Sequence, residues 1–449
     1  MTTLGDALVE FVVDTPESAI PARARANAID TVVDAVATTW AGISEDGAAV
    51  IRDATLAVAP SGESRVAGRT ERYDAASAAL CNAAAAHALD YDAINFAVSG
   101  FVGSATVAAL SAVAEERDLA PRDVITSYCL GWEASAVLGR ALNPEHYALG
   151  WHPTATLALM SATTALARLV GLDHDQTRAA LSVAVSEASG VKIMIGNMLN
   201  AYHVGKAARN AITAVRFAEA GFVGNAQPLD APQGFLALFA GPSGAQTEHA
   251  LASVGTTWDL VDPGPVWKVH ACCGLIHSAA DAVDMIRAAH GVSAADVVRA
   301  DVLVHAYVPK VMHVQHPTTG YAAKFCIPYC VAAAIRDGRA GLSDFDSVDP
   351  ELVSIGERVS YGVHPDLQDG DTFFEKEFTD VRLHTTKGVF DQRVLRLQNR
   401  GTGSITDTTL REKFRECVSR TPAMARDADA EFDRIRAIDS ADRWELWAT

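Results

Sequence analysis

The sequence has few basic residues and few charged residues of any kind. Its 449 residues include 37 Lys and Arg against 55 Asp and Glu, which gives a net charge of −18 at neutral pH. Nucleic acids and anionic membranes are bound by basic surfaces, so this charge argues against both as partners. Hydrophobic residues make up 49% and charged residues 20% of the chain, as in ordinary globular proteins and not in disordered ones. The length suggests two or three domains.

The chain also lacks the features of a secreted or membrane-embedded protein. Asp6 and Glu10 lie where a signal peptide needs a basic start and an apolar core. The uncharged stretch at 93–114 is interrupted by Asn, Ser, Thr and Gly, so we predict a buried loop and helix there and no membrane span. An odd number of scattered cysteines is not a disulfide framework, and we expect a soluble, cytoplasmic protein. The cysteines are Cys81, Cys129, Cys272, Cys273, Cys326, Cys330 and Cys417.

Up to about residue 255 the chain is rich in alanine and has helical periodicity. Predicted helices in this part cover residues 22–42, 75–91, 154–171 and 203–221. Helices with such small side chains can pack closely, so we expect a compact all-α domain in which several helices are almost wholly buried.

The pattern changes after residues 261–267, and β-strands become part of the prediction. The elements predicted here are a strand at 298–308, a helix from near Pro317 to 338, a hairpin at 381–397 around Lys387-Gly388, and amphipathic helices at 410–418 and 423–438, the first capped by Asp407 or Thr408 after a break at 399–407. We therefore predict a mainly α protein with a large all-helical domain formed from both chain ends (1–263 and 401–449) and a smaller inserted α+β domain (264–400).

The segment HALDYDA (87–93) follows an alanine-rich run. If the helix continued through it, His87, Asp90 and Tyr91 would share one helical face. Polar groups in such apolar surroundings need hydrogen bonds or a function. A structural network and an active-site carboxylate are equally good interpretations.

The segment EHYALGWHPTATLAL (145–159) places His152 directly before Pro153, a residue that favours the first turn of a helix. His152 is therefore predicted at or near an N-cap, where free N–H groups and the positive end of the helix dipole suit a carboxylate or phosphate. The histidine can be an acid/base group, an anion ligand or simply a cap.

The segment NMLNAYHVGKAARN (197–210) places His203, Lys206 and Asn210 at helical spacing, with Arg209 beside Asn210. Basic groups at the start of an otherwise apolar helix suggest anion binding, and a solvated basic face is the alternative. The Gly-x-Lys sequence is not a P-loop, because the other glycines of that motif are missing.

The segment WKVHACCGLIH (267–277) combines basic side chains with thiols: Lys268, His270, Cys272, Cys273 and His277. It matches a zinc or iron–sulfur motif poorly, since the cysteine spacing is wrong for both. Lys268, in an apolar segment at the predicted domain junction, is the better functional candidate, because clefts often lie at such junctions. Cys326 and Cys330 are predicted on one helical face and indicate core packing.

Taken together, six segments resemble the MmgE/PrpD family, in the family's order and over nearly the whole chain. They are HALDYDA, GWHPTAT, HVGKAARNA, APQGFLALFAG, WKVHACCGLIHSAADA and PTTGYAAKFCIPYCVA. The family includes 2-methylcitrate dehydratases, cis-aconitate decarboxylases and iminodisuccinate epimerase. The resemblance implies a large helical domain, a smaller α+β lid, a homodimer, and an active site between the domains that uses no metal or organic cofactor.

The resemblance also implies which residues form the site. The expected catalytic residues are Asp90, His152, Lys268 and Tyr147, and the expected substrate-binding residues are His203, Lys206, Asn200, Tyr91, Thr154 and Cys273. The base would be Asp90 or His152, and the cations would stabilise the enediolate-like charge that forms when a proton leaves a carbon next to a carboxylate.

The chain departs from the family pattern at two places. Many members carry histidines soon after the Asp-aromatic-Asp motif, whereas AINFAVSGFVGS follows Asp92 here. Many members also carry a lysine at the position of Asn200. Both changes remove groups that can donate protons or bind carboxylates.

The resulting prediction is a lyase of the 2-methylcitrate dehydratase or cis-aconitate decarboxylase type that acts on a small di- or tricarboxylic acid. The two departures favour an epimerase of the iminodisuccinate type as the alternative, and a non-catalytic carboxylate-binding homologue is a further one. The net charge does not oppose an anionic substrate. The cations Lys206, Arg209 and Lys268 lie in apolar segments, whereas much of the acidity lies elsewhere, as in the C-terminal segment 423–445.

Overall fold

The computed structural model describes residues 2–368, 377–395, 403 and 405–447. The chain forms two units. The first unit joins Met1–Val266 with Thr406–Thr449, and the second is Trp267–Ile405. The molecule is mainly helical, with a small mixed sheet in the second unit. Whether the units are domains that fold on their own, and whether the second acts as a lid, stay predictions.

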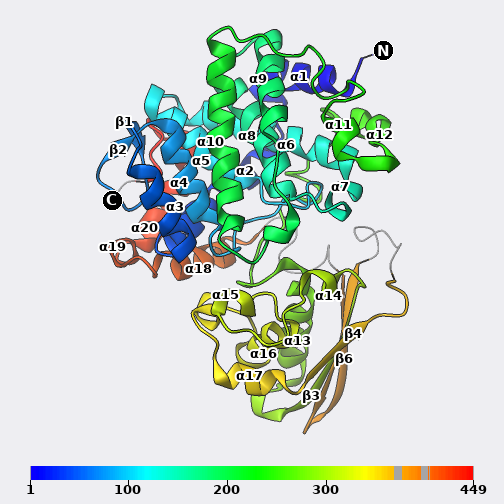
Figure 1. Ribbon diagram of the computed structural model, residues 1–449. Helices are drawn as coiled ribbons and strands as arrows, with labels where there is room; N and C mark the ends of the chain where they lie inside the picture. The colour runs from blue at the N-terminus through cyan, green and yellow to red at the C-terminus, as the bar shows by residue number, and fades with distance from the viewer. Residues whose placement is uncertain (1, 369–376, 396–402, 404, 448–449) are drawn as a thin grey trace. The chain divides into compact units, whose positions relative to one another are not determined.

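The first unit is built from helices that take up most of its described residues (Figure 1). They are α1 (Leu4–Asp14), α2 (Ala22–Gly42), α3 (Asp46–Leu56), α4 (Ala75–His87), α5 (Gly103–Arg117), α6 (Pro121–Leu142), α7 (Glu145–Ala148), α8 (Pro153–Leu169), α9 (His174–Glu187), α10 (Leu199–Glu219), α11 (Phe235–Phe239), α12 (Thr247–Ser253), α18 (Asp407–Val418), α19 (Pro422–Ala425) and α20 (Ala428–Arg436).

Small residues allow the central helices of this unit to pack closely. α10 packs on α4 and α8, and α6 packs on α8. A Cβ atom added at Gly205 of α10 would lie 2.6 Å from the carbonyl oxygen of Leu80 in α4, and one at Gly131 of α6 would lie 2.6 Å from Cβ of Ala165 in α8. The predicted close packing of small-sided, buried helices is confirmed.

The prediction of an all-α first domain is wrong in one detail. Two short antiparallel strands, β1 (Ser61–Arg65) and β2 (Arg72–Tyr73), lie between α3 and α4. The sequence of β1, SGESR, has no apolar alternation, so periodicity does not reveal it. The uncharged stretch at 93–114 forms a largely buried loop followed by α5, as predicted. None of the helices in the described part of the chain has the length and apolar character needed to cross a membrane.

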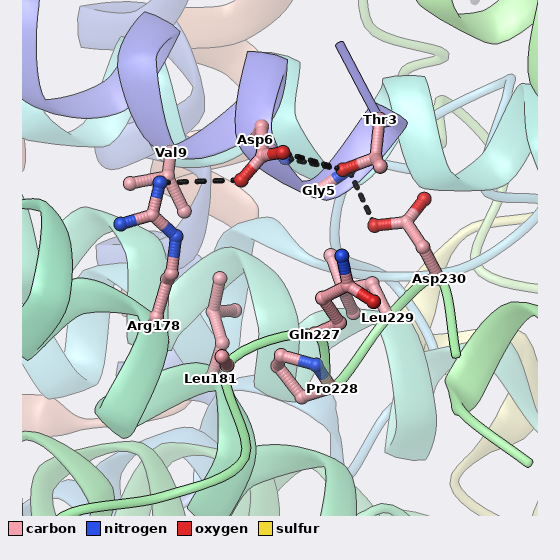
Figure 2. A pocket seen from close by; sticks show the side chains of 11 residues that line it. Thr3, Gly5, Asp6, Val9, Arg178, Leu181, Gln227, Pro228, Leu229 and Asp230 are labelled. Carbon is pink, nitrogen blue, oxygen red and sulfur yellow. Dashed lines mark hydrogen bonds and ion pairs between the residues drawn. The ribbon is translucent and has the colours of Figure 1, made fainter. Parts of the chain in front are cut away.

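The N-terminal end of α1 is held by side chains from three parts of the first unit. Figure 2 shows Thr3, Asp6, Arg178 and Asp230 around a small pocket beside this helix end. The N–H of Gly5 donates to the Asp230 carboxylate over 2.9 Å, and Arg178 pairs with Asp6 over 3.2 Å. No predicted site residue lines this pocket.

The second unit contains a four-stranded sheet in the order β4-β3-β5-β6. Only the β3–β4 pair is parallel. Its elements are α13 (His277–His290), β3 (Val297–Val304), α14 (Val308–Val311), α15 (Gly320–Ala323), α16 (Ile327–Asp337), α17 (Pro350–Gly356), β4 (Val359–Val363), β5 (Phe378–Thr385) and β6 (Gly388–Leu395) (Figure 1). The predicted hairpin is confirmed, with its turn at Thr386 and Lys387; residues 396 and 397 lie outside the described residues.

Several predicted boundaries are wrong. The helix expected from Pro317 to 338 is split into α15 and α16, because Cys326 is extended as the N-cap of α16 and Pro328 occupies its first turn. The helix expected at 423–438 is split at Asp427 into α19 and α20. Thr406, and neither Asp407 nor Thr408, caps α18, and its hydroxyl accepts the N–H of Thr409. Most of the predicted break at 399–407 lies outside the described residues.

Candidate active site

His152 lies at the N-cap of α8, as predicted. Its backbone is extended (φ −99°, ψ 101°), and Pro153 follows at the first helical position. The imidazole makes no capping hydrogen bond to its own helix. Instead, the N–H of His152 donates to the carbonyl oxygen of Gly190 over 3.0 Å. The structure therefore leaves the His152 side chain available for other partners.

The partner of the His152 side chain is His203, which lies in the first turns of α10. Nδ1 of His152 lies 2.8 Å from Nδ1 of His203, and both rings are buried. Burial, reinforced by the nearby Lys206, lowers the pKa of His203 to about 4. Burial also holds the pKa of His152 well below its usual range, with smaller effects from the charges of His203, His87 and Lys192. Both imidazoles are therefore neutral at pH 7.

A hydrogen bond between two neutral imidazoles through their Nδ1 atoms fixes the protons on both rings. One ring must carry its proton on Nδ1, which leaves its Nε2 with a lone pair. The other ring accepts at Nδ1, so its Nε2 carries the proton. The His152–His203 pair thus offers one basic nitrogen and one N–H donor. When the basic Nε2 takes up a proton and the other Nε2 gives one up, the shared proton crosses between the Nδ1 atoms and the two roles are exchanged.

The pair lies beside residues 188–198, a segment that contains a 3-10 helix (Lys192–Met194) and pairs through Val191 with Trp151, just before α8. Lys206 of α10 donates from Nζ to the carbonyl oxygen and hydroxyl of Ser189, over 2.8 and 2.6 Å. Burial lowers the pKa of Lys206. The predicted substrate-binding role of Lys206 stays a prediction. In the structure its ammonium group binds Ser189 of the 188–198 segment.

Gly190 has to be glycine at this position. Its φ is +143°, and an added Cβ would lie 2.4 Å from Cβ of Ala155 and 3.4 Å from Nε2 of His203. We expect Gly190→Ala to destabilise the protein by about 1–3 kcal/mol, because the segment must move away from α8. Turnover should fall with it, because the segment also positions His203. Thermal unfolding and steady-state kinetics measure both effects.

Gly196→Ala is the matched control. Gly196 lies in the same segment with φ +93°, but an added Cβ would meet no atom within 4 Å. This variant should cost only the backbone strain of about 1–2 kcal/mol and leave turnover nearly unchanged. Equal effects of the two substitutions on turnover would show that the close approach to His203 is unimportant.

Asp90 does not lie on a helix with His87, so the prediction of a shared helical face is wrong. α4 ends at His87, and Asp90 adopts a left-handed backbone (φ +50°) with its N–H on the carbonyl oxygen of His87 at 3.0 Å. Asp90 is buried. The turn brings the Asp92 carboxylate back to the His87 ring.

His87, Asp92 and Ser104 form a buried hydrogen-bonded chain that sequence reasoning missed. Nδ1 of His87 lies 2.7 Å from the Asp92 carboxylate, whose other oxygen accepts the Ser104 hydroxyl over 2.6 Å. The Phe101 ring packs against His87 in a tilted arrangement, with ring centroids 4.5 Å apart and an interplanar angle of 55°. The network interpretation of HALDYDA is therefore supported for His87 and Asp92.

Sequence analysis also missed Lys413, which lies near the C-terminus and, with Asp34, binds the backbone at Tyr91–Ala93. Lys413 of α18 lies 2.5 Å from Asp34 of α2 and donates to the carbonyl oxygen of Tyr91 over 2.7 Å. Asp34 accepts the N–H of Ala93 over 2.9 Å. The Tyr91 hydroxyl, predicted to bind substrate, donates to Glu416 over 3.3 Å. A substrate role of Tyr91 stays a prediction.

Three further predicted residues lie in the first unit. Tyr147, on α7, contacts Lys192, whose Nζ donates to its carbonyl oxygen over 2.7 Å and lies 4.1 Å from its ring centroid. The Thr154 hydroxyl, in the first turn of α8, accepts the N–H of Phe101 over 3.2 Å. Asn200 is buried in the first turn of α10. Lys192 was missed because it lies outside any periodic pattern.

Lys268 and Cys273 belong to the second unit, and both are buried. The N–H of Cys273 donates to the carbonyl oxygen of Lys324 over 3.1 Å. The neighbouring histidines have structural partners: His270 lies 3.1 Å from Asp281, and His277 lies 3.3 Å from the carbonyl oxygen of Cys272. Within residues 2–368, 377–395, 403 and 405–447, no three His, Cys, Asp or Glu side chains form a group able to hold a metal ion.

The low pKa of His203 predicts how its NMR signal and the stability of the protein change with pH. The imidazole signal of His203 should keep its neutral chemical shift from pH 8 down to about 5.5, when followed by NMR and assigned with His203→Asn. Because the folded-state pKa of about 4 lies below the ordinary 6.5, this group favours folding above pH 6.5, and that stability is lost as the pH falls towards 4. A midpoint near 6.5 would contradict the buried pair.

The fold and the histidine pair place the chain in a class: a helical protein with an inserted α+β unit and acid/base groups at a helix start. Family models for the MmgE/PrpD N-terminal domain and the MmgE/PrpD C-terminal domain match residues 6–248 and 270–436. The chain belongs to the MmgE/PrpD family, as its motifs predicted.

Curated relatives are named as decarboxylases. A cis-aconitate decarboxylase of Aspergillus terreus is 24% identical over 362 residues, which cover 74% of this chain and 72% of the relative. The human cis-aconitate decarboxylase is 25% identical over 332 residues, 67% of each chain. A cis-aconitate decarboxylase-like protein of Aspergillus oryzae is 26% identical over 302 residues, 62% of this chain and 61% of the relative.

Proposed function

We propose that this protein is an enzyme that moves a proton at a carbon next to a carboxylate of a small di- or tricarboxylic acid, without a resident cofactor, and that it is a lyase. The observation that carries the proposal is the His152–His203 pair, with 2.8 Å between its Nδ1 atoms. Membership of the family and relatives named cis-aconitate decarboxylase support it.

In the proposed mechanism the proton leaves the carbon next to a carboxylate of the substrate. It is accepted by the basic Nε2 of the histidine pair or by the Asp90 side chain. The N–H of the other imidazole returns a proton to the intermediate. Tyr147 relays or supplies a proton. The positive end of the α8 dipole stabilises the enediolate charge. A catalytic role of Lys268 stays a prediction.

The two lyase reactions use this proton chemistry in different order. In dehydration, a C–H bond breaks, its electron pair forms the double bond, and the hydroxyl leaves as water after it takes a proton from the acid. In decarboxylation, a C–C bond breaks and carbon dioxide leaves, and the electron pair that remains on carbon takes a proton from the acid. Dehydration needs one donor beside one acceptor and decarboxylation needs the donor, and the neutral histidine pair provides both.

An epimerase is the second candidate, and one observation favours it. The pair holds an acid and a base on adjacent rings, and uptake of a proton at one Nε2 with release from the other exchanges their roles, which suits removal and return of a proton at one carbon. The segment after Asp92 without histidine, and Asn200 in place of lysine, favour the same reading. A carboxylate-binding homologue without catalysis is the remaining alternative. A homodimer and a cytoplasmic location stay predictions.

Proton NMR of the purified protein with cis-aconitate, 2-methylcitrate and iminodisuccinate distinguishes these candidates. A lyase converts one acid into a product lacking carbon dioxide or water. An epimerase interconverts two stereoisomers of an acid with no loss of mass. Conversion of no acid, with binding still detectable by calorimetry, would contradict the enzyme proposal and favour the binding homologue.

A further inference from the structure

The strand β6 forms an edge of the sheet in the second unit. It pairs with β5 over all of its residues, and among the described residues no strand pairs with its other side. Proteins usually protect a long edge strand with a proline or a bulge, because its backbone groups can pair with another chain. Residues 388–395 contain neither. Two apolar side chains on this edge are also exposed, Val389 by 55% and Leu395 by 39%.

The sheet register determines which residues of β6 turn their backbone groups towards this edge. Thr385 and Gly388 flank the two-residue turn, and residues in that position form a hydrogen-bonded pair. Such pairs recur at every second residue, so residues 388, 390, 392 and 394 face β5, and residues 389, 391, 393 and 395 face the edge. The other side of the sheet gives the same alternation, since the N–H of Ala300 in β3 donates to Arg358, directly before β4.

A second copy of β6 fits this edge in one antiparallel register, with Gln392 opposite Gln392 of the partner subunit. Asp391 then lies opposite the partner's Arg393, and Val389 lies opposite the partner's Leu395. All four are edge-facing residues, so each of these pairs can exchange two backbone hydrogen bonds. Sliding the partner by two residues, the smallest step that keeps these bonds, puts Asp391 opposite the partner's Asp391 or Arg393 opposite the partner's Arg393. Like charges directly opposite each other are destabilising, so the charges select the first register.

The charges on the open face of the sheet extend this complementarity beyond β6. Within one chain Arg382 lies opposite Asp391 at 2.6 Å, and Arg393 lies opposite Asp380 at 2.7 Å. Asp301 of β3 lies opposite Arg382 in turn. In the joined sheet one row of side chains therefore alternates in sign from strand to strand: Asp301, Arg382 and Asp391 of one subunit, then the partner's Arg393 and the partner's Asp380. Each of the three inner charges in this row has an opposite charge on both sides.

We propose that β6 pairs with β6 of a second copy of this chain, so that the two four-stranded sheets join across a two-fold axis at Gln392. The reciprocal contacts of this register are those that a two-fold axis requires. Val389 and Leu395 become covered, which removes apolar surface from water. The Gln392 amide now donates to the Arg393 carbonyl oxygen over 2.8 Å, and the partner's backbone replaces it there. The inference goes beyond the proposed function and does not depend on it.

A disulfide at the two-fold axis tests the register. Gln392→Cys places the new thiol opposite its own copy, in a pair without backbone hydrogen bonds whose Cα atoms lie about 4.5 Å apart, a separation that a disulfide can span. The seven native cysteines are buried, so the new thiol is the accessible one. With diamide as the oxidant, most of the variant should become a covalent dimer. Val298→Cys is the control, because Val298 is 58% exposed on β3 and β5 lies between it and β6, and it should link far more slowly.

Sedimentation velocity tests the same interface without a cross-link. Wild type should sediment as a dimer at micromolar concentrations. Val389→Lys/Leu395→Lys puts like charges opposite each other in both of the apolar pairs and should raise the dissociation constant of the dimer by at least about 10-fold. Val298→Lys/Val353→Lys adds the same charge at two exposed valines of the second unit outside β6, and should leave the constant unchanged. The melting temperature of each variant shows that it is folded.

Three results would overturn the inference. The first is a wild-type protein that stays monomeric at these concentrations. The second is a dimer that the two lysines do not weaken and that Gln392→Cys does not link, since its interface would lie on another surface. The third is an open-ended series of oligomers, which would show that β6 pairs with another edge, such as β4, and not with its own copy. Each of these results leaves the proposed function standing, because that proposal depends on turnover of an acid and not on β6.

Discussion

Replacing His152 with asparagine should lower turnover by about 10²- to 10⁴-fold, the usual contribution of a general acid or base. His203→Asn should cost a similar factor, although the two residues lie on different helices. The reason is that one proton is shared over 2.8 Å between the two Nδ1 atoms. Losing either ring removes the hydrogen bond that fixes the tautomer of the other. The double variant should therefore be about as slow as the slower single variant.

His146→Gln is the matched control for this double-mutant cycle. His146 is also buried, and burial lowers its pKa to about 4. Both of its ring nitrogens have protein partners, the carbonyl oxygen of Phe239 at 3.1 Å and the Thr156 hydroxyl at 2.8 Å. His146→Gln should lower the melting temperature and change turnover by less than about 10-fold. If the losses of His152→Asn and His203→Asn multiply in the double variant, the two histidines act independently and the shared-proton account is wrong.

Lys413→Met should be the most destabilising of these substitutions and should lower the free energy of unfolding by about 3–5 kcal/mol. The sequence gives no sign of this, because Lys413 lies in a C-terminal helix with an ordinary amphipathic pattern. Lys413 is 3% exposed, and its ammonium neutralises Asp34 and donates to the Tyr91 carbonyl oxygen. Without it a buried carboxylate is left unpaired. Chemical denaturation followed by circular dichroism measures the loss.

The pH dependence of this variant follows from Asp34. Burial raises the pKa of Asp34, and Lys413 opposes that rise. In Lys413→Met the folded-state pKa of Asp34 lies higher still above the unfolded value, so the contribution of Asp34 to stability is present at low pH and is lost as the pH rises through the folded pKa. The deficit relative to wild type should be larger at pH 8 than at pH 5. The double variant Lys413→Met/Asp34→Asn should recover part of the loss at pH 8. No recovery would show that the ion pair is not what Lys413 contributes.

The sequence predicts the parts of this site that depend on local rules. Pro153 indicates a helix start and therefore the N-cap position of His152. Helical spacing puts His203 and Lys206 in the first turns of one helix, and the structure agrees. Motif order then identifies the family, which the family models confirm.

The parts that were missed depend on contacts between distant residues. The run before Asp90 favours a longer helix by propensity alone, but α4 stops at His87 because Lys413 and Asp34 hold the next backbone segment. The two histidines are 51 residues apart, and no periodicity predicts that their Nδ1 atoms meet. Lys192 begins a short 3-10 helix, and its position depends on the bridge between Trp151 and Val191.

Proton NMR in D2O tests the central claim most directly, because exchange of the hydrogen next to a carboxylate reports proton abstraction whatever the final product is. The account predicts that wild type incorporates deuterium at that carbon of at least one of cis-aconitate, 2-methylcitrate and iminodisuccinate. It also predicts that His152→Asn, folded and still able to bind the acid, incorporates at least about 100-fold less. Binding without any incorporation by wild type, or equal incorporation by both proteins, would contradict it.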